Sequence, residues 1–319
     1  MRGSFARMPT IQKYRGTQKP RQRKTKRRGA GRLLAGPLVF VIIGTQIPFL
    51  ATIVFSFLSW EAFYPEQRGF VGFKNYAEIF TRGELRAAIW VTIVITVSVV
   101  TLSLLIGTAI ALMLNRSFRG RAVARTFALS PFLLVPIASA LLWKHVVLNP
   151  SYGLINKAAT WLASIFGSTE VVRKPWLSDH PLTAIIVSLV WQWTAFVMII
   201  MLAGLQSVPQ ELEEAASIDG AGRTRVLRHI TLPLLKPYAL IAVLFCSLQV
   251  IQNFDAVFSM TQGAHKTSNI AYTVYRAFFQ AQDYGLGAAM GVLVVLGTLL
   301  IILLGATTFK RLLASGKAN

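Results

Sequence analysis

The segment Glu211–Pro237 reads ELEEAASIDGAGRTRVLRHITLPLLKP and is the one long charge-dense stretch in a chain built mostly of apolar runs. Three glutamates stand among its first four residues, just after Pro209, and acidic side chains near a helix start complement the helix dipole. Asp219–Gly222 then interrupts the helical pattern, because its two glycines favour a bend. A short basic helix follows, which we expect to close at Pro233. Two short helices at an angle predict a surface knob of the kind that docks into a groove of another protein.

The motifs in this segment resemble the EAA loop of permease subunits in binding-protein-dependent ATP-binding-cassette importers. The matching residues are Glu214, Ala215, Ala216, Asp219, Gly220, Ala221, Ile230, Leu232 and Pro233. In that family the loop is a cytoplasmic coupling helix that receives the ATPase, so the resemblance implies the same role for these residues. The alternative is an ordinary amphipathic surface loop.

The composition is that of an integral membrane protein: only 14% of the residues are charged and the mean hydropathy is +0.55. Residues 1–32 carry twelve of the 33 Lys and Arg and no acidic residue. Such a block predicts a disordered cytoplasmic tail, and binding of nucleic acid or anionic lipid is the alternative. The apolar run that follows is too long for a signal peptide and lacks a cleavage site of small residues.

Six apolar runs are long enough to cross about 30 Å of hydrocarbon. They are residues 33–58, 87–114, 126–143, 182–205, 238–258 and 286–309. Residues 115–125 hold four arginines and no acid, and the tail from Lys310 is also purely basic, whereas the loops after the first and fifth runs are not. We therefore expect an all-α permease domain over residues 33–310, with six spans, cytoplasmic tails at 1–32 and 311–319, and the coupling loop, 206–237, in the cytoplasm between spans four and five.

Two outer segments carry softer signals. Phe70–Tyr76 (FVGFKNY) is similar to the "vGxxNY" element found after the first span of sugar permeases. The longest outer loop, 149–181, predicts a short amphipathic helix near Leu154–Phe166, and a surface of this size suits contact with a solute-binding protein.

Polar and aromatic side chains inside two spans are candidates for the substrate pathway, because polar groups are costly in a membrane. They are Trp191, Gln192, Trp193 and Phe196 in span four and Gln249, Asn253 and Asp255 in span five. Gln249 and Asn253 are four residues apart, which predicts one shared helix face, with Asp255 pointing elsewhere. Aromatic rings combined with amides suit carbohydrate binding. The alternative is that the tryptophans anchor the interface and the amides link helices.

The resemblance extends to these residues, because all of them except Asp255 match positions that line the mid-membrane sugar site of the maltose-type subunit. The Trp-Gln-Trp triplet looks like that of sugar-alcohol permeases. Spans four and five contain no Lys or Arg, so we expect a neutral sugar or polyol. The implied partners are a second permease, two ATPase subunits and an extracytoplasmic solute-binding protein, in a bacterial plasma membrane.

Several other chemistries lack a sequence basis. There is no Walker A motif, so we expect no enzyme activity and no cofactor on this chain, with ATP and Mg held by the ATPase. Cys246 is the single cysteine and the four histidines are scattered, so no metal site is expected, and we expect no nucleic-acid partner. A self-sufficient secondary transporter is the rival class. It would need inverted repeats and buried ion-coupling acids, and Asp255 is the only acid placed to serve.

Overall fold

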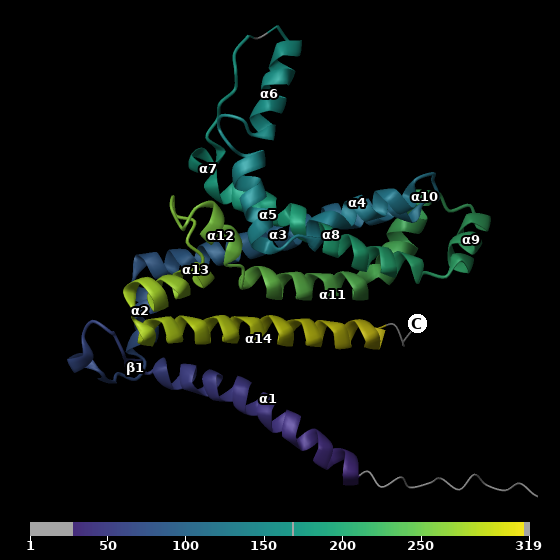
Figure 1. Cartoon of the computed structure of the whole chain (residues 1–319). Coiled ribbons are helices and arrows are strands. Elements are labelled where there is room, and N and C mark those ends of the chain that lie inside the picture. Colours follow the sequence, from purple (N-terminus) through teal and green to yellow (C-terminus); the bar gives the residue numbers. More distant parts are fainter. Residues whose placement is uncertain (1–27, 168, 316–319) are drawn as a thin grey trace, which may run out of the picture. The chain divides into compact units, whose positions relative to one another are not determined.

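A computed structural model describes residues 28–167 and 169–315, and it divides into two compact units, residues 1–49 and 50–319, which are described separately. Most of the described chain is helical (Figure 1). The α-helices are α1 Arg28–Phe55, α2 Lys74–Thr81, α3 Gly83–Asn115, α4 Arg121–Leu133, α5 Pro136–Leu142, α6 Leu154–Ile165, α7 Trp176–Asp179, α8 Pro181–Gln206, α9 Gln210–Ile218, α10 Arg223–Val226, α11 Leu232–Ile251, α12 Asp255–Met260, α13 Ile270–Tyr275 and α14 Tyr284–Ser315. Shorter elements are the 3₁₀ turn η1 Pro65–Gln67, the π turns η2 Trp143–Val147, η3 Leu227–Thr231 and η4 Arg276–Ala281, and the strands β1 Leu58–Ser59 and β2 Gly69–Phe70.

The predicted tails lie largely outside the described residues, which leave out 1–27 and 316–319. Helix α1 begins at Arg28, within the predicted N-terminal tail, and α14 continues to Ser315, beyond the predicted end of the permease domain. Unit 1 contributes the first part of α1 up to Phe49, and unit 2 contains everything from Leu50 onward.

Five helices of the described chain are long and apolar enough to cross a membrane, and a sixth span results if one bent pair is counted. The bent pair is α4 and α5, which meet at an angle of 100°. The apolar run at 126–143 therefore contains a break and contributes to two helices instead of one. Pro136 lacks a backbone N–H and disfavours helical geometry at the preceding residue, so the helix stops at Leu133 and starts again at Pro136.

The fifth span also differs from its prediction at both ends. One continuous helix runs over Arg223–Ile251, so the basic helix does not close at Pro233 but continues directly into the fifth candidate span. The π turn η3 allows this, because the N–H of Leu232 bonds five residues back to Leu227, and the widened turn accommodates the proline ring that follows. At the other end the helix stops at Ile251, and a new helix, α12, starts at Asp255.

Unit 2 is held together by α8, which packs against α3, α4 and α11, while α11 also contacts α14 (Figure 1). Close approach depends on small residues. A Cβ on Gly107 of α3 would lie 2.9 Å from a Val197 side-chain carbon of α8, and one on Gly204 would lie 2.7 Å from the Tyr238 ring of α11. Glycines at such contacts allow apolar helices to pack by van der Waals contact, which drives helix association in membranes.

The element similar to "vGxxNY" has a clear structural task. The Asn75 amide donates to the backbone oxygens of Ser56 and Leu58, at 2.9 Å each, and the Tyr76 hydroxyl donates to Ser56 Oγ at 2.7 Å. These bonds fix α2 to the chain that leaves α1, next to the antiparallel pair formed by β1 and β2. The amphipathic helix predicted in the longest outer loop is confirmed as α6.

Candidate functional site

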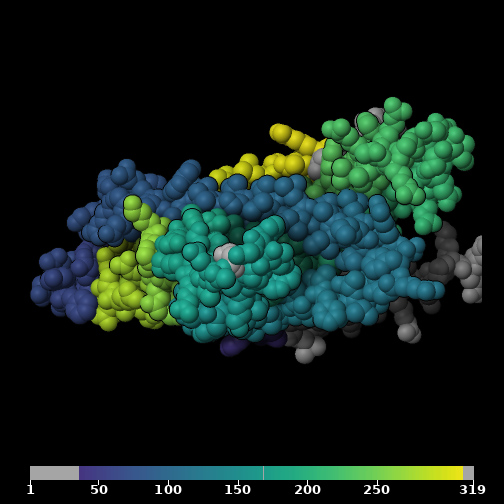
Figure 2. Space-filling model, turned by 90° about the horizontal axis from the view of Figure 1, so that it is seen from above, coloured from purple at the N-terminus to yellow at the C-terminus, as the bar shows by residue number. Residues whose placement is uncertain are grey.

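Helix α9 lies in the loop between α8 and α10 and is exposed. It begins after Pro209, and its first turn holds acidic side chains, as the helix dipole favours. None of its residues is fully buried, and Ile218 at its end is 86% exposed. In Figure 2 the green segment that contains α9 and α10 projects at one end of the surface. A short exposed helix at one end of the chain is suited to docking in a groove of another protein.

The end of α9 is closed by a Schellman motif centred on Gly220. Gly220 has φ +81°, in the left-handed region that favours glycine. Its N–H donates to Ser217 O at 3.1 Å, and the N–H of Ala221 donates to Ala216 O at 2.9 Å. A Cβ on Gly220 would meet nothing within 4 Å in this chain. A side chain at this position is therefore disfavoured by the backbone conformation and not by a close approach of other atoms.

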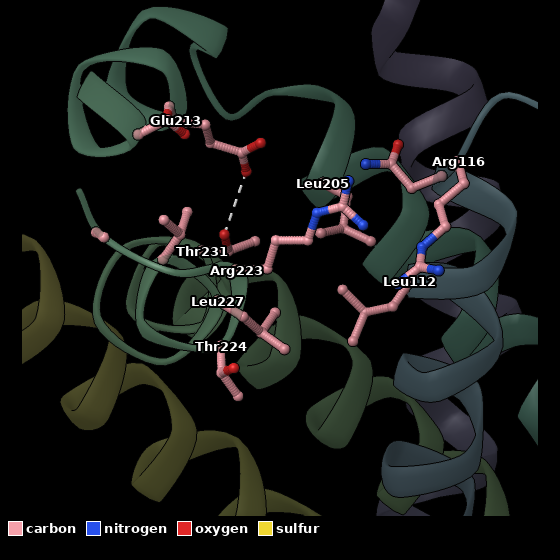
Figure 3. Close-up of a pocket in the computed structure, with 12 residues that line it drawn as sticks. Leu112, Arg116, Leu205, Glu213, Arg223, Thr224, Leu227 and Thr231 are labelled. Atoms are coloured by element: carbon pink, nitrogen blue, oxygen red, sulfur yellow. Dashed lines mark hydrogen bonds between the residues drawn. The ribbon is translucent and has the colours of Figure 1, made fainter. Parts of the chain in front are cut away.

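A hollow of about 660 Å³ separates α9 from the base of the membrane helices (Figure 3). Glu213 of α9 spans its edge, because its Oε1 accepts a hydrogen bond from the buried Thr231 hydroxyl of η3 at 3.2 Å. The hollow is floored by Leu112 and Leu205, near the ends of α3 and α8, and Arg223 extends from the start of α10 toward them (Figure 3).

The predicted coupling residues fall into two groups. Six lie on α9 and its terminal turn: Glu214, Ala215, Ala216, Asp219, Gly220 and Ala221. The other three, Ile230, Leu232 and Pro233, lie on the long helix that becomes the fifth span. Two features of this site were not predicted from the sequence. Ile218 had a signal, because it is an apolar residue at the end of a charged segment. The Glu213–Thr231 hydrogen bond had none, because it joins residues 18 apart in the chain.

The Trp-Gln-Trp triplet of α8 is mostly engaged in packing. Trp193 is buried, with its ring 6.0 Å from Phe132 and 5.9 Å from Phe196. The Gln192 amide is buried and donates to the backbone oxygen of Leu134 at 3.3 Å, at the break between α4 and α5. Trp191 is half-buried and lies edge-on to Trp143, with ring centroids 6.0 Å apart.

Phe196 connects this cluster to α11, because its ring stacks on that of Phe245 with centroids 4.7 Å apart. Phe245 is 44% exposed, so the aromatic cluster reaches the surface of the chain there. Gln249 lies one turn further along α11 and is also exposed.

Gln249 and Asn253 do not share a helix face, because α11 ends at Ile251. Asn253 stands in the break instead, where its Oδ1 accepts from the N–H of Ala256 at 3.3 Å and its backbone oxygen accepts from the Asn269 amide. Asp255 is the first residue of α12, so its predicted direction relative to Gln249 has no helical basis. Within the described ranges, no group of three His, Cys, Asp or Glu residues is arranged to hold a metal ion.

Similarity to known proteins agrees with this architecture. The alginate-importing ABC transporter of bacteria has a chain with a TM-score of 0.74, 21% identity, and coverage of 88% of this chain and 95% of that one, which shows a shared fold. The trehalose/maltose transport system permease protein MalF of Thermococcus litoralis is 34% identical over 88% of this chain and 92% of its own. The sulfoquinovosyl glycerol transport system permease protein SmoG of Agrobacterium fabrum is 30% identical over 82% of this chain and 83% of its own.

The family model described as "Binding-protein-dependent transport system inner membrane component" matches residues 103–313, which include α4 to α13 and the whole α9 loop. With 34% identity to a permease protein over most of both chains in addition, the family is settled: this chain belongs to the inner membrane components of binding-protein-dependent transport systems.

Proposed function

We propose that this chain is one permease subunit of an ATP-driven importer that moves a neutral sugar or polyol delivered by an extracytoplasmic solute-binding protein. Relatives named as permeases for trehalose and maltose, trehalose, and diacetylchitobiose support a carbohydrate. A related fold occurs in an alginate transporter solved together with a substrate-bound periplasmic protein, which supports a binding-protein partner. The expected setting is the bacterial plasma membrane, with both termini and α9 in the cytoplasm.

The observation that carries the proposal is the construction of α9. It is an exposed helix with a fixed terminal turn, and its neighbour Arg223–Ile251 is a single helix that continues into the membrane. A partner that pushes on α9 therefore acts, across the turn at 219–222, on a helix that continues into the fifth predicted span. We assign this docking to an ATPase subunit, one of two, with Glu214, Ala215 and Ala216 in contact. ATP and Mg belong to that partner, and the second permease completes the pathway.

A neutral solute is favoured by the few cations that the described structure places on the helices of the candidate pathway. The helical part of α8 contains no Lys or Arg, and Lys236 of α11 lies near its start, far along the helix from Gln249. Lys144 of η2 is engaged, because its Nζ donates to Ser259 O at 2.9 Å. One relative is named for the transport of sulfoquinovosyl glycerol instead. The rival, a secondary transporter, is not favoured, because the family match covers residues 103–313.

The test is to substitute the exposed Ala215 by arginine in the assembled transporter. We expect Ala215→Arg to abolish co-purification of the ATPase and uptake while membrane insertion stays normal, because a charged, bulky group would be placed in a docked surface. The matched control for ATPase co-purification and membrane insertion is Ala158→Arg, on the exposed face of α6, which the proposed orientation places on the other side of the membrane. Unchanged ATPase binding by the α9 variant would refute the assignment of α9.

A further inference from the structure

We infer that the hollow beneath α9 binds the phosphate group of an anionic membrane lipid. The inference rests on the proposed orientation, which places this end of the spans at the inner leaflet. The hollow has a volume of about 660 Å³ and is formed by the ends of α3 and α8 together with α9, α10 and η3. It lies beside the exposed residues of α9 assigned to ATPase contact, Glu214, Ala215 and Ala216, none of which lines it.

Two arginines give the hollow its charge. Arg116 directly follows α3, and Arg223 begins α10, so two separate segments bring guanidinium groups to one space (Figure 3). Neither has a carboxylate partner within the described residues, where the ion pair found joins Arg82 and Glu78. The acid of the hollow, Glu213, is bonded to Thr231 instead. Guanidinium groups form strong, charge-assisted hydrogen bonds with phosphate oxygens, so the site is complementary to an anion.

The other lining groups suit a lipid better than a small soluble anion. Leu112 and Leu205 lie within the last four residues of two membrane helices, so the apolar floor stands where hydrocarbon gives way to headgroups. Asn115 and Thr224 add an amide and a hydroxyl at the polar side. A phosphodiester held between the arginines would leave its glycerol and first acyl carbons against the leucines. Basic pockets between helices on the cytoplasmic side are a recognised form of headgroup site.

Neighbouring arginines provide a matched comparison. Arg125 is already engaged, since its Nη2 donates to Leu114 O at 3.2 Å. Arg119 and Arg228 belong to the same two segments but do not line the hollow. The variant Arg116→Gln/Arg223→Gln and the control Arg119→Gln/Arg228→Gln therefore remove the same charge from the same region of the surface.

The experiment is native mass spectrometry of the purified full-length chain in detergent, titrated with phosphatidylglycerol or phosphatidylcholine. We expect one tightly bound phosphatidylglycerol. The double variant should weaken its binding by about 30-fold, because each basic residue beside an anionic headgroup contributes about a factor of five. The control should change it by less than about threefold, since exposed charges away from the headgroup are screened. Thr224→Trp, which fills the hollow and keeps both arginines, should also weaken binding, so the result does not rest on one variant.

Three outcomes would overturn the inference. Equal loss in variant and control would mean a diffuse basic surface. Inorganic phosphate that displaces the lipid at similar concentration would mean a soluble-anion site. Loss of ATPase co-purification in the double variant with lipid binding unchanged would mean that the hollow belongs to a protein interface. Because lipid binding is measured on this chain alone, the result is independent of uptake, and a failure here is distinguishable from a failure of the proposed transport function.

Discussion

Gly220 allows the role of α9 to be tested with three substitutions that separate backbone strain from surface charge. The residue has φ +81°, and a Cβ there would meet no atom within 4 Å, so alanine introduces only conformational strain. That strain is about 1–2 kcal/mol for a non-glycine residue in the left-handed region. Asparagine tolerates this region better, and aspartate has the same shape as asparagine with a negative charge added.

The strain acts on the two bonds that close the α9 turn, from Gly220 N to Ser217 O and from Ala221 N to Ala216 O. If only the closed turn docks, the apparent affinity for the ATPase falls with the closed fraction. For Gly220→Ala the greatest weakening is therefore about 5- to 30-fold, as 1.4 kcal/mol corresponds to a factor of ten. Gly220→Asn should stay within a few-fold of the parent. Gly220→Asp should be much weaker than Gly220→Asn, because a charge is desolvated at the docked surface.

The assay is the affinity of the ATPase subunit for the permease complex in nanodiscs, with binding-protein-stimulated ATP hydrolysis and uptake measured in parallel. Thermal unfolding serves as the control and should be unchanged in all three variants, since the turn is exposed. Equal ATPase binding by the aspartate and asparagine variants would show that no charge is desolvated at this position on docking. Parent-like binding by the alanine variant would show that docking does not depend on the closed turn.

Three further predictions concern the rest of the chain. Gln192→Leu should lower the stability of the permease by about 1–3 kcal/mol in thermal unfolding, because the Leu134 oxygen loses its buried donor, whereas the exposed Gln206→Leu on the same helix should not. Gln249→Leu should reduce sugar uptake, because an unpaired substrate hydroxyl costs about 1–3 kcal/mol. Binding-protein-stimulated ATP hydrolysis should stay largely intact. Wild-type uptake of every solute would show that Gln249 is not part of the pathway. Deleting residues 1–26 should leave assembly and transport intact, because this segment has too few apolar residues to pack. Arg27, Arg28 and Arg32 remain to orient the first span. Lost transport with normal insertion would instead indicate a regulatory or lipid-binding tail.

The locations of the membrane helices followed from the sequence, because long apolar runs are a strong signal. Their interruptions did not. Pro136 does break the third span, but Pro131 sits inside α4 and Pro233 and Pro237 sit inside the Arg223–Ile251 helix without ending it. A proline ends a helix unless the preceding turn of backbone can accommodate its ring. The π turn before Pro233 does so, and residue types alone do not predict that turn.

The helices and the turn of the α9 loop were also predictable, because each has a local signal in the sequence. The acids at its start, the glycine after Asp219 and the arginines that follow are local signals, and the structure turns them into α9, a Schellman turn and α10. The Glu213–Thr231 bond and the hollow beside it depend on how the chain returns on itself, which no local pattern encodes.

The polar residues within the apolar runs divide into two classes once their partners are known. Gln192 donates at the break in span three, and the amide of Asn269, in the segment that follows span five, donates to the backbone oxygen of Asn253 at the break in that span. Irregular backbone is tolerated at membrane depth only where such groups satisfy it, so these amides have a structural reason to be polar. Lys144 also has a structural role, because its Nζ donates to the Ser259 backbone oxygen and so joins η2 to α12.

Gln249 differs from this set, since it is exposed on α11 one turn beyond Phe245, whose ring continues the aromatic cluster of α8. An amide that no helix break requires, beside an exposed ring, has the two properties that a sugar needs: a hydrogen-bonding group for its hydroxyls and an apolar face for its C–H bonds. The substrate pathway is therefore better sought along Phe245 and Gln249 than at the buried Trp-Gln-Trp triplet. On this basis a substitution at Gln249 should alter transport without altering stability, and one at Gln192 should do the reverse.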